Sequence, residues 1–252
     1  INSLDIGGAE VMMANLVQHL EGNLFDSEVI SLTGDGPIAN SLIESGVNVN
    51  CIRMPPGRLS LSGMIQLGKH LRNLQPDLVQ TWLYHSDLLG GLAARLSGVE
   101  HVCWGLNNTN LDRDKTRLYT RQAVYLCAKL SQWIPERIVF NSFRSANIHQ
   151  QMGYVSDKFH WIPNGFNTDI FHANPQIGQH FRVKLGIPNS VNVIGHVARF
   201  DSQKNHAGLL KAFSQVLNHY PEVHLLCCGN DVTSENSELM HCIRQYGLAK
   251  RV

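Results

Sequence analysis

The sequence predicts an α/β protein with two domains, each built on a parallel sheet. Segments with the period of a helix alternate with short apolar segments typical of buried strands. The alternation breaks once, at residues 163–165, and then begins again. The chain has 252 residues, which is too many for one ordinary hydrophobic core. Strands joined by helices need crossover connections, and such connections make a parallel sheet with helices on both faces.

The first domain is expected to cover residues 1–172. Its expected strands lie at 28–32, 47–54, 77–82, 101–104, 137–140 and 159–163. Its expected helices lie at 11–20, 38–44, 61–71, 88–96 and 115–133, with one more after the N-cap Ser142.

The second domain is expected to cover residues 173–252. The connection before it contains Pro175 and the turn at 188–190. Its strands are expected at 191–198 and 223–228, and its helices at 206–219 and 234–246. A typical domain has about 100–150 residues, so we expect this domain to be incomplete and the chain to be shortened at its C-terminus. Because the first residue is Ile1 rather than Met, we expect a shortened N-terminus as well.

Charge and cysteine content narrow the function classes. Lys and Arg number 21 against 20 Asp and Glu, which argues against a protein dedicated to nucleic acids. None of the six cysteines forms a C-x-x-C pair, so free thiols in a reducing, cytoplasmic setting are expected. The 13 histidines are scattered, and we expect neither a metal site nor a cofactor. No apolar run reaches the roughly 20 residues of a membrane-spanning helix.

Two glycines, Gly7 and Gly8, open the first helix. Glycine lets a ligand approach the backbone, and free N–H groups at a helix start favour an anion such as phosphate. A tight turn that only starts the helix explains the pair equally well. The motif is not G-x-G-x-x-G, which weakens a dinucleotide-binding interpretation.

Two cations flank the loop at 199–205 in the second domain. Arg199 follows the end of a strand, and Lys204 lies at a helix start. In an open parallel sheet ligands bind at this end of the strands. A guanidinium and an ammonium there would bind a diphosphate, whereas the alternative is two solvated surface cations.

Three motifs together resemble glycosyltransferase family 4. They are Gly7-Gly-Ala-Glu10, the segment 161–171 (WIPNGFNTDIF) and the segment 195–205 (GHVARFDSQKN). The resemblance covers nearly the whole chain and implies the GT-B fold, in which two Rossmann-like domains face each other across a nucleotide-sugar cleft. It also implies retaining, metal-independent sugar transfer. Arg199 and Lys204 would then bind the donor diphosphate, and Gly7 and Gly8 would assist from the first domain.

The sequence departs from the family pattern in two places. A later pair of glutamates that contacts the donor would lie beyond Val252. Where the family often has a histidine after a first-domain strand, this chain has Asn107 and Asn108. Asparagine binds a sugar hydroxyl but does not shuttle a proton. Asn108 is therefore a catalytic candidate without an acid–base role.

His85 is the second catalytic candidate, because it follows the strand at 77–82. Its imidazole would contact the acceptor or the transferred sugar. Packing at the start of the next helix is an equally good explanation.

The segment 119–133 combines aromatic, aliphatic and basic residues and raises the alternative of peripheral membrane contact. Because its charge is sparse, packing against the sheet is the preferred interpretation. A location at the inner face of a membrane stays open within the expected cytoplasmic setting.

The predicted function is transfer of a sugar from a nucleotide-diphosphate donor to a glycan or lipid-linked acceptor. One alternative is a GT-B-fold sugar-nucleotide epimerase, which would need carboxylates that the visible loops do not offer. The other is a truncated, inactive fragment. No nucleic-acid partner is expected.

Overall fold

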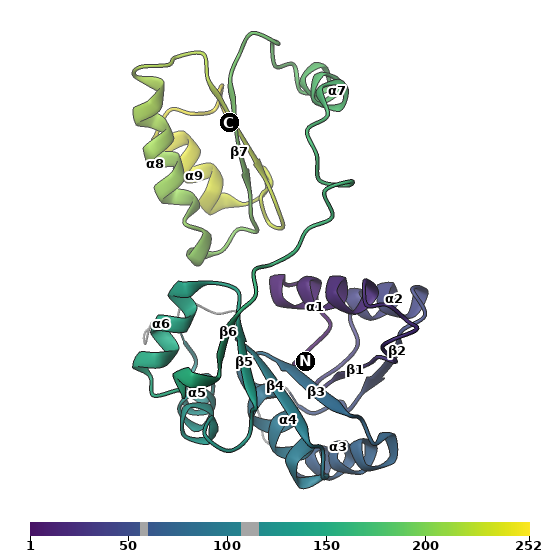
Figure 1. The fold of residues 1–252 in the computed structure, drawn as a ribbon. Helices are drawn as coiled ribbons and strands as arrows, with labels where there is room; N and C mark the ends of the chain where they lie inside the picture. The colour runs from purple at the N-terminus through teal and green to yellow at the C-terminus, as the bar shows by residue number, and fades with distance from the viewer. Residues whose placement is uncertain (56–59, 107–115) are drawn as a thin grey trace. The chain divides into compact units, whose positions relative to one another are not determined.

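The structure, a computed structural model, describes residues 1–55, 60–106 and 116–252. Asn107 and Asn108 therefore lie outside the described residues. The chain forms two compact units, Ile1–Phe166 and Asn167–Val252, whereas the sequence suggested a boundary after residue 172. Figure 1 shows the elements of each unit.

The first unit has the expected α/β architecture with parallel pairing. Its described strands are β1 (Glu28–Ser31), β2 (Asn48–Cys51), β3 (Leu78–Trp82), β4 (His101–Leu106), β5 (Arg137–Phe140) and β6 (Phe159–Trp161). The strand order is β1-β2 in one sheet and β3-β4-β5-β6 in the other. Ile1 and Asn2 accept hydrogen bonds from the backbone beyond β1, at Leu32 and Thr33, so this segment runs beside β1.

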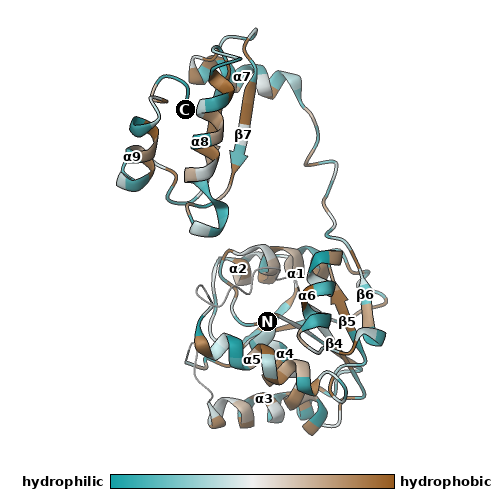
Figure 2. Cartoon of the chain, turned by 90° about the vertical axis from the view of Figure 1, so that its left-hand side faces the viewer, coloured by the Kyte–Doolittle hydropathy of each residue, from teal (hydrophilic) through white to brown (hydrophobic). Residues whose placement is uncertain are grey.

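Helices cover both sides of these strands. They are α1 (Gly8–Gln18), α2 (Pro37–Glu44), α3 (Leu61–Leu74), α4 (Tyr84–Leu96), α5 (Leu118–Leu130) and α6 (Phe143–Gln151), with a 3-10 turn, η1 (Ser156–Lys158). Figures 1 and 2 both show α1 and α2 on one side of the strands and α3, α4 and α5 on the other, and Figure 1 shows these three helices in a row.

Strand β4 runs through the centre of the first unit's core. Val102, Trp104 and Leu106 are almost completely buried. Helix α4 approaches Trp104 so closely that a Cβ atom on Gly91 would lie 2.7 Å from the indole nitrogen. Glycine at this position lets the helix pack directly on the strand.

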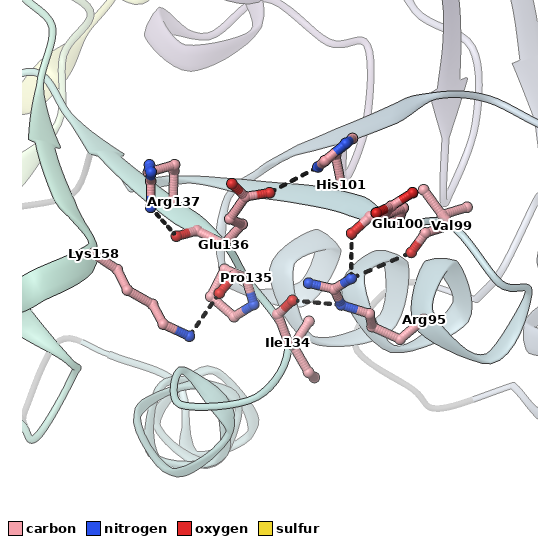
Figure 3. A network of polar contacts seen from close by, with 9 residues as sticks. All are labelled: Arg95, Val99, Glu100, His101, Ile134, Pro135, Glu136, Arg137 and Lys158. Atoms are coloured by element: carbon pink, nitrogen blue, oxygen red, sulfur yellow. Dashed lines mark hydrogen bonds and ion pairs between the residues drawn. The ribbon is translucent and has the colours of Figure 1, made fainter.

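Cations bind backbone carbonyl groups at the amino ends of β4 and β5 (Figure 3). The Arg95 guanidinium donates to Ile134, Val99 and Glu100. The Lys158 ammonium donates to the carbonyl oxygens of Ser131 at 2.9 Å, Gln132 at 2.6 Å and Pro135 at 2.8 Å. Lys158 therefore satisfies carbonyl groups that the end of α5 leaves without helical partners.

Replacing Lys158 with Met should destabilise the first unit. Because hydrogen bonds to a charged group contribute about 1.5–3 kcal/mol each and this site is partly solvated, we expect a loss of about 2–3 kcal/mol in the free energy of unfolding. Urea denaturation followed by circular dichroism measures the loss. The control is Lys129→Met, because the Lys129 side chain is exposed on α5 and contacts the Tyr125 ring rather than carbonyl groups. Equal stability of the two variants would contradict the assigned role of Lys158.

The second unit has a smaller core between one sheet and its helices. Parallel strands β7 (Val193–Val197) and β8 (His224–Cys228) pair along their whole length. Helices α8 (His206–Leu217) and α9 (Ser237–Gln245) supply Leu210, Phe213, Leu239 and Ile243 to the core.

One helix of this unit was not predicted from the sequence. The Pro175 region forms α7 (Pro175–Leu185) rather than a connection without helix. The Asn174 side chain accepts a hydrogen bond from the Ile177 N–H at 3.0 Å, and Gly186 ends the helix with φ 67°. An N-cap asparagine, a proline in the first turn and a C-terminal glycine are helix-boundary signals.

Candidate functional site

The loop between β7 and α8 carries both cations predicted to bind a diphosphate. It starts against the end of β8, where Ala198 N–H donates to Cys228 at 2.9 Å and Phe200 N–H to Asn230 at 2.8 Å. A Cβ atom on Gly229 would lie 2.0 Å from the carbonyl oxygen of Ala198. Glycine is needed here because no side chain fits between the two backbones.

Side-chain caps shape the rest of this loop. Asp201 accepts a hydrogen bond from Gln203 N–H at 2.9 Å and starts the 3-10 turn η2 (Ser202–Lys204). Asn205 has φ 52° and accepts from Gly208 N–H at 3.2 Å, which caps α8. Asparagine tolerates this left-handed conformation better than most residues. The loop therefore leads directly into the positive end of the α8 dipole.

Arg199 and Lys204 lie in this loop, and both side chains are exposed. Arg199 Nε lies 3.6 Å from Asp201 Oδ2, in a loose ion pair. Within the described ranges, the Lys204 ammonium has no hydrogen bond or ion pair of its own. The Gln203 N–H, and then Arg199, hold the pKa of the Asp201 carboxyl below its ordinary value. The loop thus presents two cations and one ionised carboxylate.

Two histidines pack against each other at the point where this loop joins the sheet and α8. His206, the first residue of α8, is 3% exposed and packs 4.8 Å from the His196 ring and 5.1 Å from the Phe200 ring. Burial lowers the pKa of His206, which keeps its imidazole neutral. Aromatic packing at its base therefore fixes where the loop leaves the sheet.

Gly7 and Gly8 lie at the start of α1, as predicted. Gly7 is the N-cap and supplies no side-chain hydrogen bond, so the first N–H groups of α1 lack a side-chain cap. The Glu10 carboxylate folds back toward this end, and a Cβ atom on Gly7 would lie 2.2 Å from Glu10 Oε2. An anion that binds here must displace this carboxylate or share the helix end with it.

His85 lies in the first turn of α4, directly after β3. Leu83, the residue before α4, has φ 75° and ψ 151°, a strained conformation for a non-glycine residue. The His85 ring packs 5.4 Å from the Tyr119 ring, and the Tyr119 hydroxyl oxygen accepts a hydrogen bond from Arg117 at 2.8 Å. In the described part of the chain, His85 Nε2 is buried without a hydrogen-bond partner. Burial lowers the pKa of His85, so the imidazole is neutral.

A buried carboxyl group lies two residues after His85. Asp87 is fully buried, and its Oδ1 accepts a hydrogen bond from Thr81 Oγ1 at 2.6 Å. Burial raises the pKa of the Asp87 carboxyl well above its ordinary value. This group holds the start of α4 against β3.

The comparisons with known proteins assign the family. The profile of Glycosyltransferase Family 4 matches residues 6–170, and that of Glycosyl transferases group 1 matches residues 179–252. The chain belongs to glycosyltransferase family 4.

One relative by sequence agrees with this assignment, and two solved structures share the fold. EpsF of Bacillus subtilis, which is named as a glycosyltransferase, is 25% identical over 246 residues, covering 91% of this chain and 60% of EpsF. HepE of Anabaena, solved with UDP-glucose, has a TM-score of 0.81 at 21% identity, covering all of this chain and 66% of HepE. The UDP-GlcNAc 2-epimerase of Methanocaldococcus jannaschii has a TM-score of 0.58 at 13% identity, covering 98% of this chain and 68% of the epimerase. The chain therefore spans less than two thirds of EpsF and HepE, and it has the GT-B fold.

The predicted residues lie in two separate units. Arg199 and Lys204 share one loop of the second unit, whereas Gly7, Gly8 and His85 belong to the first unit. The contact of Asp201 with Arg199 was not predicted from the sequence. The cap that Asp201 makes does have a sequence signal, because an aspartate at the start of a turn commonly accepts a hydrogen bond from the backbone N–H two residues later. The contact of Tyr119 with His85 joins two helices and has no local signal.

Among the described residues, no group of three His, Cys, Asp or Glu side chains is arranged to hold a metal ion. No described helix is both long and apolar enough to cross a membrane.

Proposed function

We propose that the whole protein transfers a sugar from a nucleotide-diphosphate donor to a glycan or lipid-linked acceptor, with retention of configuration and without a bound metal. The main observation in support is the loop that holds Arg199 and Lys204 at the start of α8, in a chain of glycosyltransferase family 4. A UDP-sugar is the proposed donor class, supported by HepE, which is solved with UDP-glucose.

The proposed role of this loop is to stabilise the leaving diphosphate. As the bond from the anomeric carbon to the phosphate oxygen breaks, positive charge develops on the sugar and negative charge on the diphosphate. Arg199, Lys204 and the α8 N–H groups lie at the same end of α8 and would oppose that negative charge. This arrangement supplies the electrostatic role that a metal ion has in other enzymes.

Residues of the first unit have separate proposed roles. His85 is neutral, and its buried Nε2 has no hydrogen-bond partner among the described residues, so it would hydrogen-bond the acceptor or the transferred sugar. Gly7 and Gly8 would offer a second anion-binding helix start. Asn108 keeps its proposed role as a hydrogen-bond partner of a sugar hydroxyl.

A transfer assay tests retention and metal independence. The whole protein is incubated with UDP-sugars and with glycan and lipid fractions of the producing cells, in the presence of EDTA, and the product anomer is assigned by proton NMR. We expect product with the anomeric configuration of the donor, at a rate unchanged by EDTA. An inverted product, or loss of activity that Mg²⁺ or Mn²⁺ restores, would contradict these two features.

Asp201→Asn should tighten UDP binding. Asparagine keeps an acceptor for the Gln203 N–H but removes the negative charge beside Arg199. From the interaction of unit charges at such separations near a protein surface, we expect about a three- to tenfold lower Kd. Isothermal titration calorimetry measures it. Asp201→Ala removes the cap as well and should bind UDP no more tightly than Asp201→Asn. Unchanged or weaker binding by Asp201→Asn would show that the carboxylate does not oppose the ligand.

A further inference from the structure

Two histidines lie on either side of the loop that joins β7 to α8 (Figure 1). His196 is the last residue but one of β7, and His206 is the first residue of α8. Their rings lie 4.8 Å apart in an edge-to-face arrangement. The His206 ring also lies 5.1 Å from the ring of Phe200, which belongs to the loop itself. Three rings therefore join the end of the strand, the loop and the start of the helix.

The imidazole of His206 is enclosed without a polar partner. His206 is 3% exposed, and among the described residues both of its ring nitrogens are buried without a hydrogen bond. Within the same ranges, His196 Nε2 is also buried and unpaired. A buried charge without a partner costs far more free energy than a buried neutral polar group. The surroundings of His206 thus accept a neutral ring much better than a protonated one.

The charged groups around His206 do not favour its protonation. The loop carries two cations, Arg199 and Lys204, and one carboxylate, Asp201, which pairs with Arg199 and accepts from a backbone N–H in the loop. On β8, Cys227 lies beside His196 in the strand register, and burial raises the pKa of its thiol, which is therefore neutral. The other ionisable side chains on α8 and α9 that are charged near neutral pH, or are histidines, are exposed: Lys211, Glu238, His241 and Arg244.

The direction of the pH dependence follows from these surroundings. Burial, and after it the neighbouring His196, lower the pKa of His206, while the Ala198 carbonyl group opposes this with a smaller effect. A histidine released to solvent has a pKa of about 6.5. The released ring therefore binds a proton more readily than the packed ring. The packed state has its full stability above about pH 6.5 and loses stability as the pH falls below that value.

We propose that His206 is a positioning residue for this loop: its neutral ring, packed on His196 and Phe200, holds the loop against the end of β8, and protonation releases the loop. Release would remove Arg199 and Lys204 from their place at the start of α8. The inference rests on the proposed function in one respect, because the loop matters to the reaction only if it binds the donor diphosphate. A histidine that only fills the core would pack in the same way without coupling the loop to pH.

Hydrogen exchange of the whole protein without ligand tests this coupling. The reporter is the Phe200 N–H, which donates to the Asn230 carbonyl oxygen at 2.8 Å. After correction for the intrinsic pH dependence of exchange, its protection should be about tenfold lower at pH 5.5 than at pH 7.5. The reason is that a released histidine with a pKa of about 6.5 is protonated about ten to one at pH 5.5.

A second amide shows whether the opening is local. The Leu225 N–H of β8 donates to the Arg251 carbonyl oxygen at 2.7 Å, within the same unit. Phe200 should exchange faster than Leu225 at both pH values, because the loop opens without unfolding of the sheet. Equal protection of the two amides would mean that the loop opens only when the unit unfolds, which would contradict local release.

Substitutions separate the titration of His206 from its packing. His206→Phe keeps a ring against His196 and Phe200 but binds no proton, so the protection of the Phe200 N–H should differ less than about twofold between the two pH values. His206→Leu makes the same test with a smaller side chain, and circular dichroism confirms that the variants fold. The matched control is His219→Phe, at an exposed histidine just after α8, which should keep the tenfold response. No pH response in the parent, or the full response in a folded His206 variant, would overturn the proposal.

UDP-glucose separates this inference from the proposed function. Both of its phosphates are diesters, so its charge is constant between pH 5.5 and 7.5. At a concentration about ten times its Kd, UDP-glucose should raise the protection of the Phe200 N–H about tenfold at pH 5.5, because it binds the closed loop. Protection that UDP-glucose leaves unchanged would contradict the diphosphate-binding role of the loop. The response of His206 to pH is decided by the ligand-free exchange.

Discussion

Replacing both Arg199 and Lys204 with alanine is expected to lower kcat/KM for the nucleotide sugar by about 10²–10⁴-fold. Each charge-assisted hydrogen bond to the donor diphosphate contributes about 1.5–3 kcal/mol, and every 1.4 kcal/mol is a factor of ten in rate. Negative charge grows on the diphosphate as the sugar leaves, so part of the loss should lie in kcat. Steady-state kinetics with varied donor, and again with varied acceptor, measures both.

The matched control is Lys211→Ala, which removes an exposed lysine from the same helix, α8. It should retain kcat/KM within about twofold. Lys204→Arg should restore the activity only in part, because a planar guanidinium does not reproduce a compact ammonium at a helix start. A folded double alanine variant that turns over donor within twofold of the parent would leave Arg199 and Lys204 as solvated surface cations.

Replacing His149 with alanine is expected to reduce the free energy of unfolding by about 3–5 kcal/mol, the range for losing a large core side chain and leaving a buried partner unpaired. His149 is fully buried on α6. Its Nδ1 donates to the Ser145 carbonyl oxygen at 2.7 Å, and its Nε2 accepts from the Tyr84 hydroxyl at 2.8 Å. Urea denaturation at pH 7.5 measures the loss. The control is His160→Ala on β6, because His160 is exposed.

The lowered pKa of His149 also leads us to expect that the free energy of unfolding depends on pH. Burial lowers the pKa of His149 below its ordinary value in the folded protein. Below the unfolded value of about 6.5 the unfolded chain therefore binds a proton more readily, so stability falls as the pH falls. We expect the parent to be less stable at pH 5.5 than at pH 7.5, and His149→Ala to show a smaller difference. An equal pH dependence in parent and variant would show that His149 does not couple protonation to folding.

The order of strands and helices followed from the sequence because each segment carries its own periodicity. The expected strand at 77–82 corresponds to β3, and the expected helix at 206–219 corresponds to α8. Boundaries were less accurate, because capping decides them. The expected helix at 115–133 is observed as α5 (Leu118–Leu130), where carbonyl groups after Leu130 bind Lys158 instead of continuing the helix.

The candidate site was predictable only where its residues are neighbours in the sequence. Arg199 and Lys204 share one loop, so a strand followed by a helix was enough to place them together. The contact of His85 with Tyr119 and the bond of Tyr84 to His149 join residues 34 and 65 positions apart. Such contacts depend on how helices pack across a sheet, which no local pattern specifies. For the same reason, the sequence did not decide whether one side of α5 would be exposed or packed.

The stoichiometry of the reaction tests the central claim most directly. The whole protein is incubated with UDP-sugar carrying a radiolabelled sugar and with its acceptor fraction, and released UDP and label in the acceptor are counted together. The account predicts one UDP released for each sugar transferred, with both amounts reduced in parallel by Arg199→Ala. Conversion of the nucleotide sugar to an epimer, with no label in the acceptor and no UDP released in proportion, would contradict it.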